Sequence, residues 1–324
     1  MRHVIWVFLA LLVVSVANAG DGTFGYEPVI EDMIKDYLAK VNKNAPDEGA
    51  RQCERLYTRA LKKGVLDIRY ALGYFDVSKG VDQIVDGKNY GLSPSLDIEI
   101  FKGLRRQLKS RCWSFNKRLC GFDEAGDPGN GKAVFTRKMD LHGQKILVRL
   151  TLTQASASPY FQKNKGELAS RQAFLTRQSE QNFFGGLQTA DIVFYNGHSR
   201  NGGGPDFAPP ILNSSNKVNY RGYYRVKRPG ILKTLAALKA TRNPGVIVGF
   251  FSCFSRLHFY KTFMQNNPHQ RLILSAERIN YYDTLQGSIG YLEGMLRGSC
   301  GDELSHIAEQ NEKLQGGFQS YNLQ

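Results

Sequence analysis

The sequence predicts an α/β protein whose mainly parallel sheet is covered by helices on both faces. In the second half of the 324-residue chain, short runs that are apolar throughout alternate with segments of helical periodicity, as expected for parallel strands buried on both sides. The apolar content of 42% and the charged content of 22% are those of a globular protein, and they exclude an intrinsically disordered chain. The length favours two domains over one.

Residues 1–19 have the features of a secretory signal peptide. Arg2 and His3 precede an apolar run over 4–16, and Ala17-Asn18-Ala19 follows. A basic start, an apolar run too short to span a bilayer and a small-x-small site are typical of such a signal. We expect cleavage after Ala19 to release a mature chain without a transmembrane segment. The protein is therefore expected to be secreted or periplasmic.

Residues 20–125 predict a small all-helical domain. Over 26–41, apolar side chains recur at steps of three and one, which traces one face of a helix. Two further helices are expected around Tyr57 and Leu104. The glycine-rich segment 126–132 comes next and is expected to be a linker. It would join the helical domain to an α/β domain over 133–324.

The elements of the α/β domain are expected in a regular order. Residues 133–141 and 145–153 predict a β-hairpin that turns at His142-Gly143. Helices and strands then alternate. The expected helices are 169–187, 231–240, one through Phe259 and Phe263, and 283–297, and the expected strands are 190–195, 245–251 and 271–276.

Positive charge is concentrated in the second half of the chain. Residues 20–128 contain 18 basic and 17 acidic residues, whereas residues 129–324 contain 24 and 12. Such a field would attract an acidic substrate or an anionic polymer of the cell envelope. The sequence has no helix-turn-helix, zinc-finger or single-strand-binding signature, so we expect no specific nucleic-acid partner.

Two of the predicted strands lead into reactive side chains. The strand 190–195 runs into Asn196-Gly197-His198-Ser199, and the strand 245–251 runs into Ser252-Cys253. In parallel sheets the chemistry collects at the carboxyl ends of the strands, and neighbouring strands lie about 4.8 Å apart. An imidazole beside a thiol can take its proton and return it to a leaving group. We therefore expect His198 and Cys253 to form a catalytic pair.

These two motifs resemble those of the caspase–legumain–gingipain group of cysteine peptidases. In that group one apolar strand ends in a His and a later apolar strand ends in the catalytic Cys; here the two residues are 55 positions apart. The resemblance implies a caspase-like fold and an endopeptidase that acts on a peptide or protein and needs no cofactor. It also implies an oxyanion hole made by the N–H groups of Ser199, where the group usually has Gly, and Cys253.

Charged residues near the pair are candidates for binding the substrate. Asp206 is the only acidic residue between Ser199 and Ser252, and Glu277 follows the last predicted strand. Either carboxylate would select a basic substrate side chain, whereas Arg200 would select an acidic one. The sequence leaves this choice open.

The cysteines predict at least one free thiol. There are five of them, at positions 53, 112, 120, 253 and 300, and an odd number in an exported protein cannot all pair. Cys53 and Cys112 fall on apolar faces of predicted helices, so we expect Cys53 to pair with Cys112 or Cys120 and Cys253 to be free. The spacing of His and Cys residues has no zinc-site pattern, so no metal is predicted.

Two other functions stay open. Gly197-His198-Ser199 is similar to the start of the nucleophile elbow of α/β-hydrolases, which would make Ser199 the nucleophile of a serine hydrolase. In this chain Asn201 replaces the last Gly of that motif, and the glycine-rich residues 202–205 do not suit a helix. The other function is a non-catalytic binding or interaction protein on a caspase-like scaffold.

Overall fold

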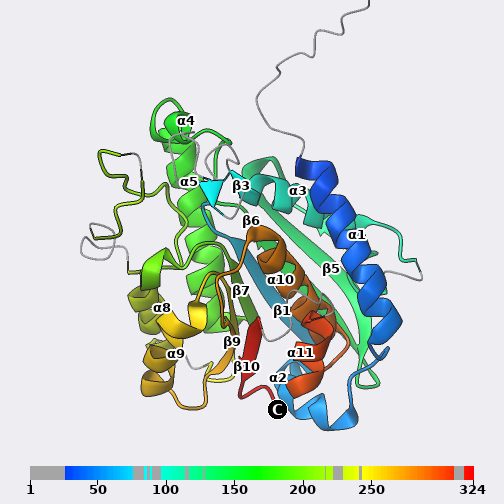
Figure 1. Ribbon diagram of the computed structural model, residues 1–324. Coiled ribbons are helices and arrows are strands. Elements are labelled where there is room, and N and C mark those ends of the chain that lie inside the picture. Colours follow the sequence, from blue (N-terminus) through cyan, green and yellow to red (C-terminus); the bar gives the residue numbers. More distant parts are fainter. Residues whose placement is uncertain are drawn as a thin grey trace, which may run out of the picture.

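An eight-stranded sheet lies between two layers of helices (Figure 1). The computed structural model describes residues 26–75, 84–85, 88–89, 96–113, 117–126, 128–215, 217–221, 229–240, 243–309 and 317–324. The signal peptide expected over 1–19 lies outside these ranges. In the described ranges, no helix has both the length and the apolar character needed to cross a bilayer.

The strands follow the order β10-β9-β8-β7-β1-β6-β5-β4. From β9 to β6 the neighbours run parallel, and antiparallel pairs lie at both edges. This confirms the mainly parallel α/β class. The bounds are β1 Val65–Leu72, β4 Asp123–Ala125, β5 Lys132–Leu141, β6 Gln144–Thr153, β7 Ile192–Asn196, β8 Ile247–Phe251, β9 Arg271–Ser275 and β10 Phe318–Tyr321. A separate short hairpin pairs β2 (Ile84–Val85) with β3 (Lys88–Asn89).

Each face of the sheet has its own hydrophobic core. The first core packs against α1 (Tyr26–Asn44), α2 (Glu54–Lys63), α3 (Leu96–Lys109), α10 (Tyr281–Leu296) and α11 (Gly301–Ala308). The second packs against α4 (Phe161–Lys165), the π-helical turn η3 (Gln181–Gly185), α6 (Gly186–Thr189), α8 (Gly230–Lys239) and α9 (Ser255–Asn266), with α5 (Ala169–Glu180) leading into η3. Along β7, Ile192 and Phe194 join the first core, whereas Val193 and Tyr195 join the second. This alternation explains why the strand is apolar at every position.

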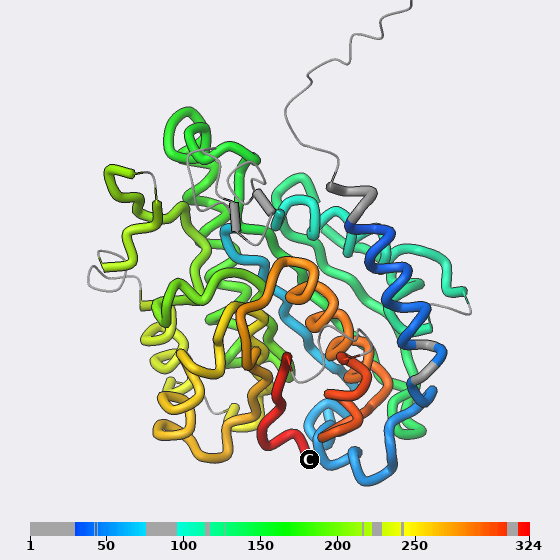
Figure 2. Tube along the Cα trace, in the orientation of Figure 1, coloured from blue at the N-terminus to red at the C-terminus, as the bar shows by residue number. Residues whose placement is uncertain are grey.

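A separate helical domain over 20–125 is not confirmed. Residues 65–72 form β1, which pairs with both β6 and β7 in the middle of the sheet. Figure 2 shows this light-blue segment running through the centre of the molecule, among segments that come much later in the chain. Helices α1 and α3 do form, but they share one core with α10 and α11. The first and second halves of the chain therefore build one sheet together.

The segment 126–132, predicted as a linker, connects two strands of that same sheet. Strands β4 and β5 pair with Ala125 opposite Val134, and the short turn η2 (Pro128–Asn130) lies between them. Gly126 and Gly131 have φ values of 97° and 67°, in the left-handed region that glycine adopts without strain. The glycines therefore serve a turn within the sheet and do not separate two domains.

The predicted order of elements over 133–324 is confirmed. The hairpin forms as β5 and β6, with Leu141 opposite Gln144. Its two turn residues, His142 and Gly143, have φ values of 48° and 74°, as a tight hairpin turn requires. The later helices and strands begin and end close to their predicted positions, with 169–189 divided among α5, η3 and α6.

Candidate functional site

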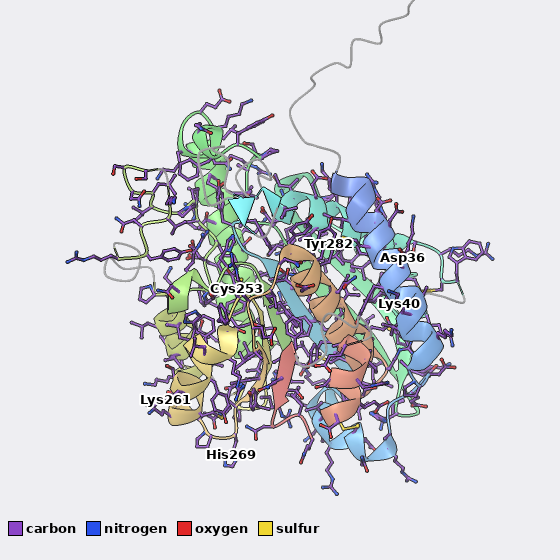
Figure 3. All side chains as sticks on the ribbon, viewed as in Figure 1. Asp36, Lys40, Cys253, Lys261, His269 and Tyr282 are labelled. Atoms are coloured by element: carbon purple, nitrogen blue, oxygen red, sulfur yellow. A yellow bond between two sulfur atoms is a disulfide. The ribbon has the colours of Figure 1, made fainter. Side chains whose placement is uncertain are left out.

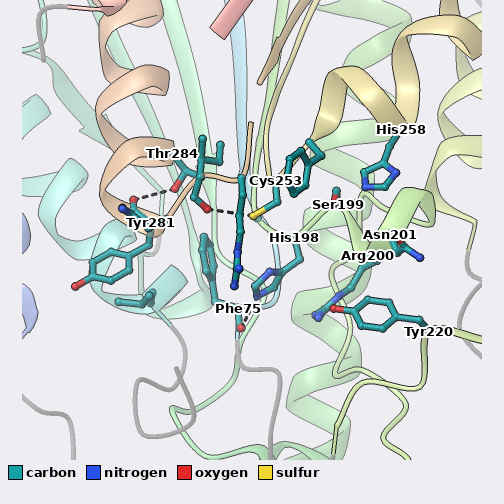
Figure 4. A pocket seen from close by; sticks show the side chains of 16 residues that line it. Phe75, His198, Ser199, Arg200, Asn201, Tyr220, Cys253, His258, Tyr281 and Thr284 are labelled. Atoms are coloured by element: carbon teal, nitrogen blue, oxygen red, sulfur yellow. Dashed lines mark hydrogen bonds between the residues drawn. The ribbon is translucent and has the colours of Figure 1, made fainter. Parts of the chain in front are cut away.

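A cavity of about 490 Å³ opens at the carboxyl ends of β7 and β8. His198 and Cys253 both line it, together with residues that follow β1 and β9 (Figure 4). In Figure 3 Cys253 lies near the middle of the molecule, while His269, which precedes β9, lies at its lower edge. The cavity therefore occupies the edge of the sheet where parallel α/β proteins collect their functional residues.

The register of β7 and β8 brings His198 and Cys253 together. Asn196 lies opposite Phe251, and His198 and Cys253 each follow two residues later. The Gly197 N–H donates to the Phe251 carbonyl oxygen at 3.2 Å, so the pairing continues beyond the strands. The two side chains thus leave matching positions on neighbouring strands, and both point into the cavity (Figure 4).

The ring of His198 is oriented by the backbone that follows β1. Its Nε2 lies 2.8 Å from the carbonyl oxygen of Phe75, and the two rings are in contact with their centroids 5.7 Å apart. A carbonyl oxygen only accepts hydrogen bonds, so Nε2 carries the proton and Nδ1 keeps the lone pair of the neutral ring. Burial, with a smaller effect of Arg200, lowers the pKa of His198 to about 3. The imidazole is therefore neutral at pH 7 and accepts a proton at Nδ1.

Cys253 carries the one free thiol among the five cysteines. Its Sγ donates to the carbonyl oxygen of Ile279 at 3.1 Å. Burial raises the pKa of the Cys253 thiol, while the hydrogen bond to Ile279 and the charge of Arg278 act in the opposite direction. No hydrogen bond joins this thiol to His198 in the described part of the chain. The resting pair is thus a neutral thiol beside a neutral imidazole.

A sharp turn after Cys253 keeps the thiol at the tip of its strand. Phe254 has φ 50° and ψ 30°, in the left-handed region, and α9 begins at the next residue. The Phe254 N–H donates to the Glu277 carbonyl oxygen at 2.8 Å, which fixes the turn against the segment that follows β9. The side chain before such a turn projects beyond the sheet, where a substrate can approach it.

The backbone beside the pair is suited to binding an anion. The N–H groups of Ser199 and Cys253 donate no hydrogen bond to another residue in the ranges that the structure describes. Ser199 has φ −70° and ψ −14°, and Arg200 has φ 49°. A right-handed residue followed by a left-handed one turns successive N–H groups toward the same side, which makes an anion-binding concavity.

The charged candidates for substrate binding occupy different places. Arg200 and Asp206 form a buried ion pair, with Nε and Oδ2 3.2 Å apart. Arg200 lines the cavity, whereas the wall does not include Asp206. Glu277 is exposed and also lies outside the wall. Among the described residues that line the cavity, none carries a carboxylate.

Sequence reasoning missed Arg278, whose charge acts on the Cys253 thiol. It lies in the segment between β9 and α10 and lines the cavity. The same rule that singled out His198 and Cys253 could have found it, because β9 is the parallel neighbour of β8 and Arg278 follows its carboxyl end.

The expected pairing of Cys53 with Cys112 or Cys120 is wrong, whereas the free Cys253 is confirmed. Cys53 pairs with Cys300, and Cys112 pairs with Cys120 across a Cα–Cα distance of 5.1 Å. The helix expected to carry Cys112 ends at Lys109, since residues eight apart in one helix would be about 12 Å apart along its axis. The two disulfides fit a secreted or periplasmic location.

Ser199 lacks the surroundings of a nucleophile elbow. Its side chain is buried, and it is followed by η4 (Arg200–Gly202), a single short turn. An elbow leads directly into a full helix. As for metals, no group of three His, Cys, Asp or Glu side chains gathers in the part of the chain that is described.

No family model, curated protein or solved structure matches this chain. The function of the cavity is therefore inferred from its geometry and chemistry.

Proposed function

We propose that this protein is a secreted or periplasmic cysteine endopeptidase in which Cys253 is the nucleophile and His198 transfers the proton. One observation carries the proposal. The Phe75 carbonyl oxygen holds Nε2–H of His198, which leaves Nδ1 as the proton acceptor in the same cavity as the one free thiol. A base oriented by a third group next to a nucleophile is the general arrangement for covalent catalysis.

The first step starts from the neutral pair. Sγ of Cys253 bonds to the substrate carbonyl carbon while its proton passes to Nδ1 of His198, and the π electrons of the carbonyl move to the oxygen. The resulting imidazolium is favoured by the Phe75 carbonyl, which accepts from Nε2–H. It is also favoured by the negative charge that forms beside it.

Besides the imidazolium, the negative charge on the former carbonyl oxygen, the oxyanion, has to be stabilised. The N–H groups of Ser199 and Cys253 are available for this role, and losing one such donor typically costs about 10²–10³ in rate. Collapse of the intermediate expels the amine, which takes the proton from Nδ1 and leaves a thioester on Cys253. Water then attacks the thioester with His198 again as base, and the acid product and the free thiol are released.

The charges around the cavity favour an acidic substrate side chain near the cleaved bond. Asp206 pairs with Arg200 and Glu277 lies outside the wall, so neither carboxylate is positioned to receive a basic side chain. Arg278 lines the cavity close enough to act on the thiol. We therefore propose that the enzyme selects an acidic side chain, with Arg278 as the main selecting residue.

The test is a peptide-library digest read by mass spectrometry, using the mature protein with its free thiol kept reduced. We expect cuts beside acidic residues that disappear in Cys253→Ala and in His198→Ala and persist in His269→Ala, a control at the opposite end of the sheet. In Arg278→Glu the preference for acidic residues should be lost. Cutting that survives in Cys253→Ala would contradict the mechanism. A folded protein that makes no cuts would favour the non-catalytic binding protein instead.

A further inference from the structure

Most of the exposed large apolar side chains belong to segments that line the cavity or lie next to η4. In the described ranges six such side chains are exposed: Trp113, Phe174, Tyr220, Leu232, Phe254 and Leu257. Four of them, Tyr220 (48% exposed), Leu232 (59%), Phe254 (38%) and Leu257 (75%), belong to these segments. We call these four residues the apolar lip. Single exposed apolar residues are ordinary, whereas a group of them marks a surface that binds something.

The lip is continuous with the cavity. Tyr220 and Phe254 line the cavity themselves, and Phe254 is the residue next to Cys253. Leu257 follows three residues later, in the first turn of α9. In Figure 4, Tyr220 lies to one side of Cys253 with His258, while Tyr281 lies on the other side.

Leu232 extends the lip onto the neighbouring helix. It lies in the first turn of α8, whose first N–H, that of Gly230, donates to the Gly203 carbonyl oxygen at 2.6 Å. Gly203 directly follows η4, and η4 packs against α9. The first turns of α8 and α9 therefore lie next to the same turn, η4, and each carries an exposed leucine.

The lip contributes little to the packing of the helices that carry it. On α9, Phe259 and Phe263 anchor the helix and are 0% and 1% exposed. On α8, Ile231 and Ala237 have the same role. Leu257 and Leu232 point away from this core, so folding alone does not account for apolar side chains at these positions.

We propose that the apolar lip binds an apolar side chain of the polypeptide substrate, one or two residues from the cleaved bond. This inference rests on the proposed peptidase function. An extended chain advances about 3.3–3.6 Å per residue, so the second residue from the bond lies about 7 Å from it. A substrate that crosses Cys253 toward α9 first meets Phe254 and then Leu257. Its side chains in that direction therefore come to lie on the lip.

The test compares two peptides that differ only at the residue expected to lie on the apolar lip, with Leu in one and Ser in the other. For the wild-type protein we expect kcat/KM to be about tenfold higher for the Leu peptide. In Leu257→Ser this ratio should fall toward one, and in Leu257→Phe it should be retained. The control is Trp113→Ser, which removes another exposed apolar side chain (55%, against 75% for Leu257) that does not line the cavity. It should keep the wild-type ratio.

Three results would overturn the inference. The first is a wild-type protein with no preference for Leu. The second is a ratio that Leu257→Ser leaves unchanged. The third is a wild-type dimer in sedimentation that Leu257→Ser dissociates, because the lip would then bind a second copy of the chain.

Failure of the peptidase itself is recognised separately, as an absence of cutting that depends on Cys253. In that case the same two peptides are labelled with a fluorophore, and their affinities are measured for two proteins. One is the Cys253→Ala variant, and the other is the same variant that also carries Leu257→Ser. Tighter binding of the Leu peptide that is lost with Leu257→Ser would keep the lip as a ligand surface. Equal binding of the two peptides would overturn it.

Discussion

At the scale of single residues, His198 and Cys253 are both held uncharged by their surroundings. Burial lowers the pKa of His198 to about 3 and raises the pKa of the Cys253 thiol. A thiolate–imidazolium pair would need the opposite order, with the thiol more acidic than the imidazolium. In the proposed mechanism the proton of Cys253 therefore moves to His198 only as the substrate is attacked. The neutral pair also predicts how reactive the thiol is in the protein without substrate.

The rate at which iodoacetamide alkylates Cys253 should follow the fraction of thiolate. Because the pKa of this thiol is raised, we expect slow alkylation at pH 7 and a rate that keeps rising beyond about pH 8.5, the usual pKa of a cysteine. Removing the charge of Arg278 with Arg278→Gln should slow alkylation further at each pH. Mass spectrometry of the modified protein measures both. A plateau of fast alkylation between about pH 5 and pH 7 would contradict the neutral pair.

Asp97 gives a second prediction about single residues. Its buried carboxylate accepts hydrogen bonds from the N–H of Ala155 (3.0 Å), the N–H of Ser156 (2.7 Å) and the hydroxyl of Ser156 (2.8 Å). Burial nevertheless raises the pKa of Asp97 to about 7. A raised pKa means that the folded protein binds the proton more tightly than the unfolded chain does. The stability contributed by protonated Asp97 is therefore complete below about pH 4 and is lost as the pH rises through about 7.

Urea unfolding at a series of pH values tests this expectation. The free energy of unfolding should fall by a few kcal/mol between about pH 4 and pH 7 because of Asp97, and this part of the slope should disappear in Asp97→Asn. The exposed Asp123 supplies the control, since Asp123→Asn should leave the slope as it is. An unchanged slope in Asp97→Asn would show that this carboxyl group does not titrate as expected.

At the scale of elements, β7 and β8 could be predicted from the sequence and β1 was missed. The first two are apolar at every position because both of their faces are buried. In β1, Leu66, Ile68 and Tyr70 alternate with Asp67 and Arg69, which is the period of a strand. The helical periodicity of the neighbouring segments led to a wholly helical domain instead.

A second reason why β1 could not be predicted is that one of its residues pairs with a residue far along the chain. Asp67 is buried within the sheet because Arg69 and Arg149 pair with it, and Arg149 belongs to β6. No pattern in the sequence near Asp67 indicates that Arg149 is its partner. Phe75 could not be recognised from the sequence either. It acts on His198 through its backbone carbonyl oxygen, and every residue has one. Arg278, by contrast, stood at a strand end where its side chain could be recognised.

The two disulfides differ in how much of the chain they close. Cys53 and Cys300 are 247 residues apart and join the start of α2 to the start of α11, whereas Cys112 and Cys120 are eight apart. Because the loop entropy of the unfolded chain grows with loop length, replacing the first pair with Ser should lower the free energy of unfolding more than replacing the second. Losses of about 2–5 kcal/mol are typical. Urea unfolding of the two double variants measures the difference, and an equal or reversed order would contradict it.

At the scale of the whole molecule, the candidate site is assembled from segments that are far apart in the chain. The backbone after β1 orients His198 through Phe75, β7 supplies His198, β8 supplies Cys253, and the segment after β9 supplies Ile279 and Arg278. β1 lies between β7 and β6 in the sheet. The described residues before Gly126 are therefore part of the scaffold that holds His198 and Cys253.

This arrangement predicts that cutting the chain between the two halves does not separate them. A protease recognition sequence is inserted after Gly129, in the turn between β4 and β5. The Cys53–Cys300 bond would itself hold the fragments together, so the experiment uses the variant in which both are Ser. After cleavage at the inserted site, we expect the two fragments to elute together, to unfold in a single transition and to keep the cutting activity that depends on Cys253. β1 of the first fragment pairs with β6 and β7 of the second, so separation would expose the buried surface of these strands to water. Fragments that elute apart while folded, or two separate unfolding transitions, would instead show two domains joined by a linker.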